Sequence, residues 1–256
     1  MSKMQAVEVS VPSLRLNSKI ALKDEAWKKK REQSTAGLMR KRNADLAILV
    51  KHVDTLLVKL EHERRNSSEP IDIQIMLRLH ALKISMAMLS VIDDSAEDDE
   101  TSATFDRAFN YCTAYLYTRV ALGNFYWLVD SFAFRKACRE CHALIDKPVL
   151  PIWTREEELR KLGIVKSVDD EHGETLLEDL VKSHDSYDEL ALVVSGLIFA
   201  SYETTGALLG WTFHFLARHP VSYRILRESI IEEFRTVEKP LQDLNAQTLM
   251  GCTYTA

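Results

Sequence analysis

Proline and glycine are scarce in this sequence: its 256 residues include six prolines and eight glycines. Segments in which apolar and polar residues alternate with a period of two are also rare, so the pattern of half-buried β-strands is largely missing. Because turn-forming residues and strand patterns are both rare, we predict an all-α fold. Helices are expected over most of residues 21–256, after an irregular lead-in at 1–20.

Cysteine and net charge are limited as well. The chain has four cysteines, and residues 1–20 lack the apolar core of a secretory signal or a membrane anchor. These features do not indicate a disulfide framework and favour a reducing compartment. A net charge of −5 gives no reason to expect nucleic-acid binding, and 46% hydrophobic residues suffice for a sizeable core in one domain over 1–256.

Apolar residues recur at helical spacing in several segments of the chain. The predicted helices cover 46–60 with a loop at 66–70, then 72–90, 105–120 closed by Gly123, 134–145 ended by Pro148 and Pro151, 176–184 and 221–234. A further helical segment is expected over 241–250. The chain is therefore predicted to be a succession of helices joined by short connections.

The longest predicted helix covers residues 187–219, and a helix of that length spans about 50 Å. Two apolar runs, 190–200 and 206–217, flank a polar patch at 201–205. Three interpretations are open: a core helix whose Thr204 and Thr205 hydroxyls bond back to carbonyls one turn earlier, a membrane span, or a functional site. We expect no membrane span, because neither run reaches the ~20 residues that a bilayer requires and Glu203 would lie near its midplane.

Residues 200–205, Ala-Ser-Tyr-Glu-Thr-Thr, resemble the central distal helix of the cytochrome P-450 monooxygenases. The pattern of that family is Ala/Gly-Gly-any-Asp/Glu-Thr-Thr/Ser. The continuation at 211–220 is similar to fungal members that hydroxylate alkanes and fatty acids. One departure is Ser201, which stands where the family usually has glycine. Its extra bulk is expected to narrow the oxygen pocket.

Trp27 and Arg31 form a second motif near the start of the chain. Asp24 is a candidate N-cap for a helix there, and residues four apart share one helix face. By itself this lysine-rich segment indicates a solvated helix face. The pair is also similar to the Trp-x-x-x-Arg motif of the same family, which holds a haem propionate through a charge-assisted arginine hydrogen bond and the indole N–H.

The sequence Cys-Arg-Glu-Cys-His at 138–142 is a competing motif, since Cys-x-x-Cys-His is the attachment sequence of c-type haem and Cys-x-x-Cys also suits zinc or redox chemistry. Haem attachment needs an export route, for which no signal is visible, and zinc would need a further ligand. Cys138 and Cys141 both lie on the apolar stripe of a helix, where a thiol behaves as a small hydrophobe. We interpret them as core residues.

The resemblance implies a haem cofactor and assigns roles in an intact family member. Thr204 hydrogen-bonds the activated oxygen or its water, and Glu203 helps to relay the protons that split the O–O bond. Ala200 and Ser201 lie against the haem on the same helix.

The resemblance also implies partners. Residues 27 and 31 anchor the propionates, and the substrate is an apolar small molecule of the alkane or fatty-acid type. An acidic reductase meets the basic residues 28–31. Intact fungal members are anchored in the membrane of the endoplasmic reticulum, whereas this sequence is expected to contain no span.

The segment that binds the haem iron in this family has no counterpart in the sequence. Family members bind the iron through a cysteine thiolate in Phe-x-x-Gly-x-Arg-x-Cys-x-Gly, and none of Cys112, Cys138, Cys141 and Cys252 stands in that context. We therefore expect no axial metal ligand and an incomplete domain, the central portion of the family fold with both ends missing. The chain as given is expected to be inactive.

Two further expectations follow from an incomplete domain. Leu197, Leu208 and Phe215 of the long helix are expected to face solvent, because nothing in the sequence is left to cover them. The alternative to a monooxygenase fragment is a non-catalytic all-α protein whose long helix serves packing or partner binding.

Overall fold

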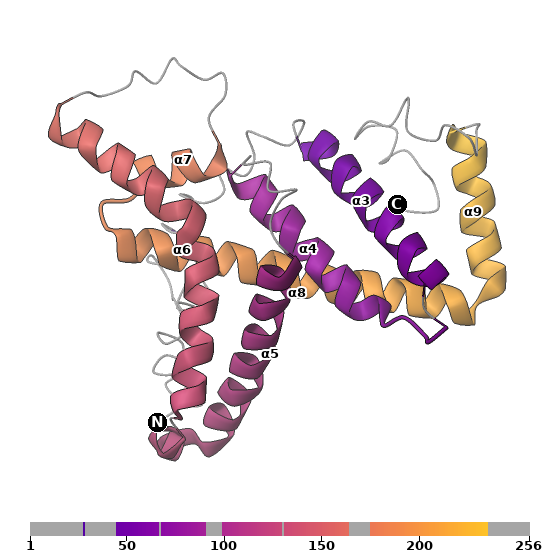
Figure 1. Ribbon diagram of the computed structural model, residues 1–256, viewed down its shortest axis with the longest axis horizontal. Coiled ribbons are helices and arrows are strands. Elements are labelled where there is room, and N and C mark those ends of the chain that lie inside the picture. The colour runs from indigo at the N-terminus through magenta and orange to yellow at the C-terminus, as the bar shows by residue number, and fades with distance from the viewer. Residues whose placement is uncertain are drawn as a thin grey trace.

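The structure is a computed structural model that describes residues 45–66, 68–90, 99–129, 131–163 and 175–234, together with Lys28. Trp27, Arg31, the lead-in at 1–20 and the segment 241–250 lie outside the described residues. Within the described ranges every regular element is a helix, which confirms the all-α prediction (Figure 1). In chain order these helices are α3 (Asp45–Asn66), α4 (Ile73–Ser90), α5 (Asp99–Leu122), the 3₁₀ helix η2 (Gly123–Leu128), α6 (Phe132–Lys161), α7 (Leu176–Lys182), α8 (Tyr187–Arg218) and α9 (Pro220–Phe234).

Helix α6 corrects one of the predicted boundaries. It was predicted to end at Pro148 and Pro151, yet it continues through both prolines to Lys161. A proline inside a helix removes one backbone hydrogen bond and pushes away the carbonyl of the preceding turn, which kinks a helix without necessarily ending it. Figure 1 shows α6 changing direction along its length. Pro148 is buried with Val149, so packing against the core holds the helix together across the kink.

The boundary between α8 and α9 follows from sequence chemistry. His219 precedes a proline and has φ −123° and ψ 75°, outside the helical region, because a residue before proline avoids helical geometry. Pro220 then occupies the first position of α9, where its missing N–H is not needed. The two helices therefore meet at a bend, and α9 extends from the end of α8 in Figure 1.

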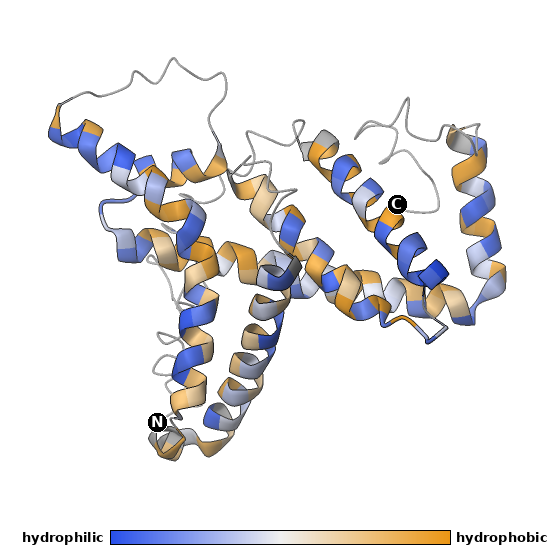
Figure 2. Cartoon of the chain, in the orientation of Figure 1, coloured by the Kyte–Doolittle hydropathy of each residue, from blue (hydrophilic) through white to orange (hydrophobic). Residues whose placement is uncertain are grey.

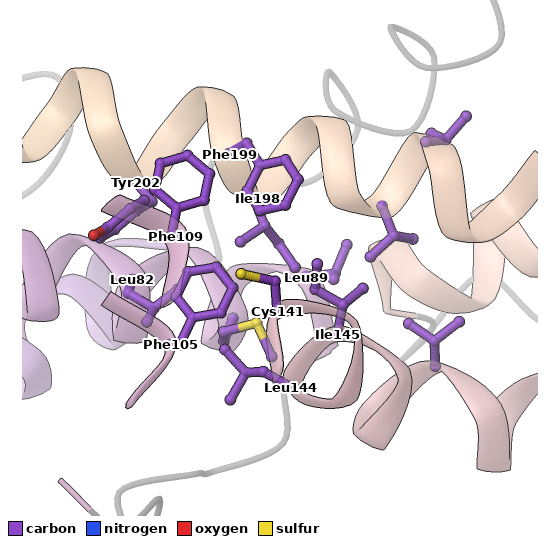
Figure 3. Packing of buried hydrophobic residues seen from close by; sticks show 14 of the residues in the cluster. Leu82, Leu89, Phe105, Phe109, Cys141, Leu144, Ile145, Ile198, Phe199 and Tyr202 are labelled. Carbon is purple, nitrogen blue, oxygen red and sulfur yellow. The ribbon is translucent and has the colours of Figure 1, made fainter. Parts of the chain in front are cut away.

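The hydrophobic core lies between the first half of α8 and helices α4 to α7. Figure 3 shows Ile198, Phe199 and Tyr202 of α8 facing Phe105 and Phe109 of α5. The Phe109 and Phe199 rings lie 4.9 Å apart between centroids. Aliphatic residues of the core include Leu144, Ile145, Val149, Leu177, Leu180, Leu190 and Val194.

Helix α8 carries hydrophobic residues over much of its length (Figure 2). In the described part of the chain it is the one helix long and apolar enough to cross a membrane by length and composition, a criterion that core helices of soluble proteins also meet. Here α8 packs on α4, α6, α7 and α9, and its first half is buried in the core. It is therefore the central core helix of this domain.

Two glycines allow α4 to approach α8 closely. A Cβ atom at Gly206 would lie 2.9 Å from the Cα atom of Arg78 and 2.7 Å from its Cγ atom. A Cβ atom at Gly210 would meet only the side chain of Gln74, whose Nε2 donates to the Gly206 carbonyl at 3.2 Å. The contact at Gly206 thus involves backbone, and the contact at Gly210 involves the end of a flexible side chain.

We predict that Gly206→Ala lowers the free energy of unfolding by about 1–3 kcal/mol, because the backbones of α4 and α8 must separate. Gly210→Ala is the matched control and is expected to be close to neutral. Gln74 can move aside, and alanine gains about 1 kcal/mol of helix propensity over glycine. Urea denaturation followed by circular dichroism measures both. Equal effects of the two substitutions would contradict the close backbone contact.

Candidate functional site

The polar patch at 201–205 is distributed around α8 and does not form one surface. Tyr202 is fully buried, whereas Ala200 and Thr204 are exposed on another side of the helix. Ser201 is partly buried and lines a cavity, and the Glu203 side chain is also partly buried. Successive residues of a helix point about 100° apart, so neighbours in the sequence reach different surroundings.

The hydroxyl groups of the patch bond to their own helix. Thr204 Oγ1 donates to the Ala200 carbonyl. Ser201 Oγ donates to the Leu197 carbonyl at 2.8 Å and to the Ile198 carbonyl at 3.1 Å. This is the bonding that the core-helix interpretation predicted for Thr204. The Thr204 hydroxyl is nevertheless exposed, so a ligand on that side of α8 can reach it.

Glu203 carries an unsatisfied polar atom. Its Oε2 atom is buried and meets no hydrogen-bond partner among the described residues. Buried polar atoms in folded proteins are nearly always hydrogen-bonded, since an unsatisfied one costs about 1–3 kcal/mol. An exception beside an exposed threonine is therefore a candidate for function.

A buried polar network lies on the opposite side of the same helix turn and joins three helices. The Tyr202 hydroxyl of α8 donates to Asp106 Oδ1 of α5. Asp106 Oδ2 accepts from Arg78 Nη2 of α4 at 3.0 Å and from Asn110 Nδ2 at 3.1 Å. Burial, followed by the hydrogen bond and the charge of Asp106, raises the pKa of Tyr202 above its ordinary value. Tyr202 therefore stays protonated and acts as the donor.

Sequence reasoning did not find this network. Asp106 and Asn110 are four residues apart on one face of α5, which gave a weak signal. Arg78 and Tyr202 come from distant parts of the chain, and their partners are set by helix packing alone.

We predict that Tyr202→Phe lowers the free energy of unfolding by about 1–3 kcal/mol, because the buried Asp106 carboxylate loses a donor. Thr204→Val serves as the matched control, since it removes an exposed hydroxyl that bonds only its own helix. A change within about 0.5 kcal/mol is expected for it. Chemical denaturation of the two purified variants measures the difference. A larger loss for Thr204→Val than for Tyr202→Phe would show that the network contributes little.

A cavity of about 650 Å³ lies between α3, α4 and α8. Its walls are mostly leucine, isoleucine and valine side chains, and it includes Leu197, which was expected to face solvent. That expectation was wrong for Leu197, which is partly buried against the core, and right for Leu208 and Phe215, which are 67% and 54% exposed. The error arose because α3 and α4 form walls around this part of α8.

His80 is a buried polar residue in the wall of this cavity. Burial, with smaller contributions from the nearby His52 and Lys83, lowers the pKa of His80 to about 4. In the unfolded chain His80 binds a proton below about pH 6.5, whereas in the folded protein it binds one only below about pH 4. Stability associated with His80 is present above pH 6.5 and is lost as the pH falls towards 4.

We predict that acidification from near pH 7 to near pH 4 destabilises the protein more than it destabilises the His80→Leu variant. The shift of the His80 pKa corresponds to a difference of up to about 3 kcal/mol. Substitution of the exposed His62 by glutamine is the control variant for the loss of a histidine. Urea denaturation at several pH values measures the effect. Parallel pH profiles for the wild type and His80→Leu would contradict it.

The cysteines of α5 and α6 lie away from the exposed side of α8. Cys112, Cys138 and Cys141 are buried in the hydrophobic core, which confirms the interpretation of the Cys-x-x-Cys motif as core packing. Across the described ranges no group of three or more histidine, cysteine, aspartate and glutamate side chains is placed to hold a metal ion.

Comparison with known proteins supplies a family for these features. A family model described as cytochrome P450 matches residues 4–253. Cytochrome P450 monooxygenase alt2 of Alternaria solani is 29% identical over 259 residues, which cover 91% of this chain and 46% of that protein. Cytochrome P450 52A13 of Debaryomyces hansenii is 27% identical over 89% of this chain and 44% of its own length.

A third relative gives the same picture. Cytochrome P450 52A9 of Candida maltosa is 27% identical over 91% of this chain and 45% of its own length. The chain thus spans less than half of the length of each of these three relatives. The matches agree with the resemblance drawn from residues 200–205 and 211–220.

Proposed function

Because the chain belongs to the cytochrome P450 family, we propose that it forms part of a haem-thiolate monooxygenase that hydroxylates an apolar substrate of the alkane or fatty-acid type. The observation that carries the proposal is the arrangement at the middle of α8. An exposed small residue, Ala200, and the exposed hydroxyl of Thr204 lie next to Glu203, whose carboxylate has an unpartnered oxygen.

The described residues fit one side of a haem site. Ala200 and Thr204, followed by the exposed Leu208 and Trp211, give α8 an open and largely apolar side against which a flat apolar group can lie. A thiolate ligand for the iron is a different matter. Cys112, Cys138 and Cys141 are enclosed in the core, so none of these three would supply a sulfur ligand to a group on the open side of α8.

Haem, when bound, supplies the iron centre that activates dioxygen. The chain contributes groups that bind and move protons beside it. Thr204 must release the Ala200 carbonyl in order to donate its hydroxyl hydrogen elsewhere, and an exposed threonine can rotate to do so. Glu203 holds a carboxyl group one residue away, and its partly buried side chain can accept a proton and pass it towards that hydroxyl.

The remaining roles rest on the sequence resemblance. The apolar substrate class follows from residues 211–220. Trp27 and Arg31 are proposed to hold the propionates, and the basic residues 28–31 to meet an acidic reductase. Lys28, the one residue of that segment that the structure describes, is exposed. Ser201 faces the cavity between α3, α4 and α8, so its proposed contact with the haem is indirect.

A non-catalytic role is the second candidate, and one observation favours it. The Thr204 hydroxyl is already satisfied within its own helix, as in an ordinary core helix. Under that role, substitutions of Thr204 and Glu203 change no activity in any context.

The proposal is tested with two proteins, the chain itself and a chimaera in which residues 1–256 replace the matching part of the Candida maltosa relative. Both are expressed with haem, reduced and exposed to carbon monoxide. The chain alone is expected to give no thiolate-type Soret band, since none of the described cysteines is accessible from the open side of α8. The chimaera is expected to give one and to hydroxylate an alkane or a fatty acid.

In the chimaera, Thr204→Ala is expected to lower product formation about tenfold or more. Thr212→Ala is the matched control, because Thr212 is exposed on the same helix and donates to the Leu208 carbonyl at 2.8 Å. A thiolate-type band from the chain alone would contradict the proposal. So would equal activities of the Thr204→Ala and Thr212→Ala chimaeras.

A further inference from the structure

Three thiols meet in the interface between α5 and α6. Cys112 lies on α5, and Cys138 and Cys141 lie three residues apart on α6. Cys112 Sγ and Cys138 Sγ are 3.8 Å apart. The thiol groups are enclosed, with exposed fractions of 0% for Cys112, 5% for Cys138 and 0% for Cys141. Figure 3 shows Cys141 in the core beside Phe105, Leu89 and Ile145.

The sulfur contact is part of a regular antiparallel helix interface. Tyr115 of α5 stacks on Phe134 of α6 with ring centroids 4.4 Å apart. Cys112 lies three residues before Tyr115 on α5, and Cys138 lies four residues after Phe134 on α6. Each step is about one helical turn. The pairing of these two residues is therefore fixed by the same register as the aromatic pair.

We propose that Cys112 and Cys138 form a disulfide when the protein meets a hydroperoxide, and that this bond joins α5 to α6 covalently. The proposal concerns the described core and does not depend on haem or on the proposed monooxygenase activity. A hydroperoxide is the oxidant of the proposal because the thiols are enclosed and hydrogen peroxide is much smaller than disulfide reagents.

The reaction balances in two steps. Cys138 attacks one peroxide oxygen, so that its sulfur becomes a sulfenic acid and the other oxygen leaves as water or an alcohol. The thiol of Cys112 then displaces the sulfenic hydroxyl as water and forms the S–S bond. The two sulfurs together lose two electrons, which reduce one O–O bond.

The surroundings of Cys112 make the second step slow. The hydrogen bond with Cys138 acts to lower the pKa of Cys112. The hydrogen bond with Cys141 and burial outweigh it and raise this pKa to about 12. Because the thiolate is the nucleophile, its small population limits the closing of the bond. We expect this closing step to limit the overall rate, so that disulfide formation rises about tenfold per pH unit between pH 7 and 9, with no plateau.

Cys141 provides the matched control. It lies in the same core, and its hydrogen bond with Cys112 leaves it within reach of the same sulfur. The 3.8 Å contact between sulfur atoms joins Cys112 to Cys138, and we expect the disulfide to form there and Cys141 to remain a thiol. Cys112→Ala and Cys138→Ala are expected to abolish the crosslink, and Cys141→Ala to preserve it.

The test treats the folded 1–256 chain with hydrogen peroxide, blocks the remaining thiols after denaturation, and maps the peptides by mass spectrometry. A linked peptide pair containing Cys112 and Cys138 is expected, with a loss of two hydrogens. The unfolding temperature measured without reductant is expected to rise by several degrees, because the bond closes a loop in the unfolded chain. Dithiothreitol is expected to reverse the rise.

Several outcomes would overturn the proposal. One is a crosslink that forms only when the protein is unfolded in urea before peroxide is added. Others are a main product that contains Cys141, oxidation of the three sulfurs to sulfonic acids without a crosslink, or a rate that does not change with pH. The same peptide mapping on the chimaera, in which the chain is part of a full-length protein, decides the case if the chain alone aggregates.

Discussion

The close contact between α4 and α8 determines which side of α8 every functional side chain faces. Gly206 lets the backbone of Arg78 lie against α8, and the Arg78 side chain binds Asp106. Asp106 also accepts a hydrogen bond from Tyr202, which lies one helical turn before Gly206 on α8. Side chains two residues apart in a helix point about 200° apart around its axis, so burying Tyr202 on this side turns Thr204 to the opposite side. The exposure of Thr204 is therefore a consequence of packing at a residue that has no part in the proposed chemistry.

This constraint also explains why the residues of one short polar patch lie in different surroundings. Tyr202 satisfies a buried carboxylate, Ser201 bonds its own helix at the edge of a cavity, and Thr204 is open to ligands. Glu203 lies between the buried and exposed sides, and its unpartnered oxygen is the cost of placing an acid at that boundary. In the sequence these residues form a single interruption of an apolar helix, and only the three-dimensional structure separates their roles.

Helix positions could be predicted from the sequence because apolar periodicity is a local property. The bounds of α8 and α9 agree with the expected ranges, and the pairing of Pro220 with a break at His219 follows from proline chemistry alone. The continuation of α6 past Pro148 could not be predicted, since burial against distant residues decides whether a kinked helix persists. The partners of Asp106 and the cavity wall beside Leu197 were missed for the same reason. The proposed roles of Ala200, Glu203 and Thr204 rest on family membership and on exposure, and those of Trp27 and Arg31 fall outside the described residues.

Folding and proposed function are divided along the length of α8. Its first half, from Leu190 to Tyr202, supplies the buried side chains of the core. Beyond Gly206, the side chains of Leu208, Trp211 and Phe215 are 54–67% exposed. Exposed apolar side chains that gather on one side of a helix are a feature of interaction sites more than of free protein surface. The core of α4 to α8 can therefore hold the first half of the helix rigid without help from a cofactor. The second half presents these side chains to a covering group, and haem is the cofactor of the family to which the chain belongs.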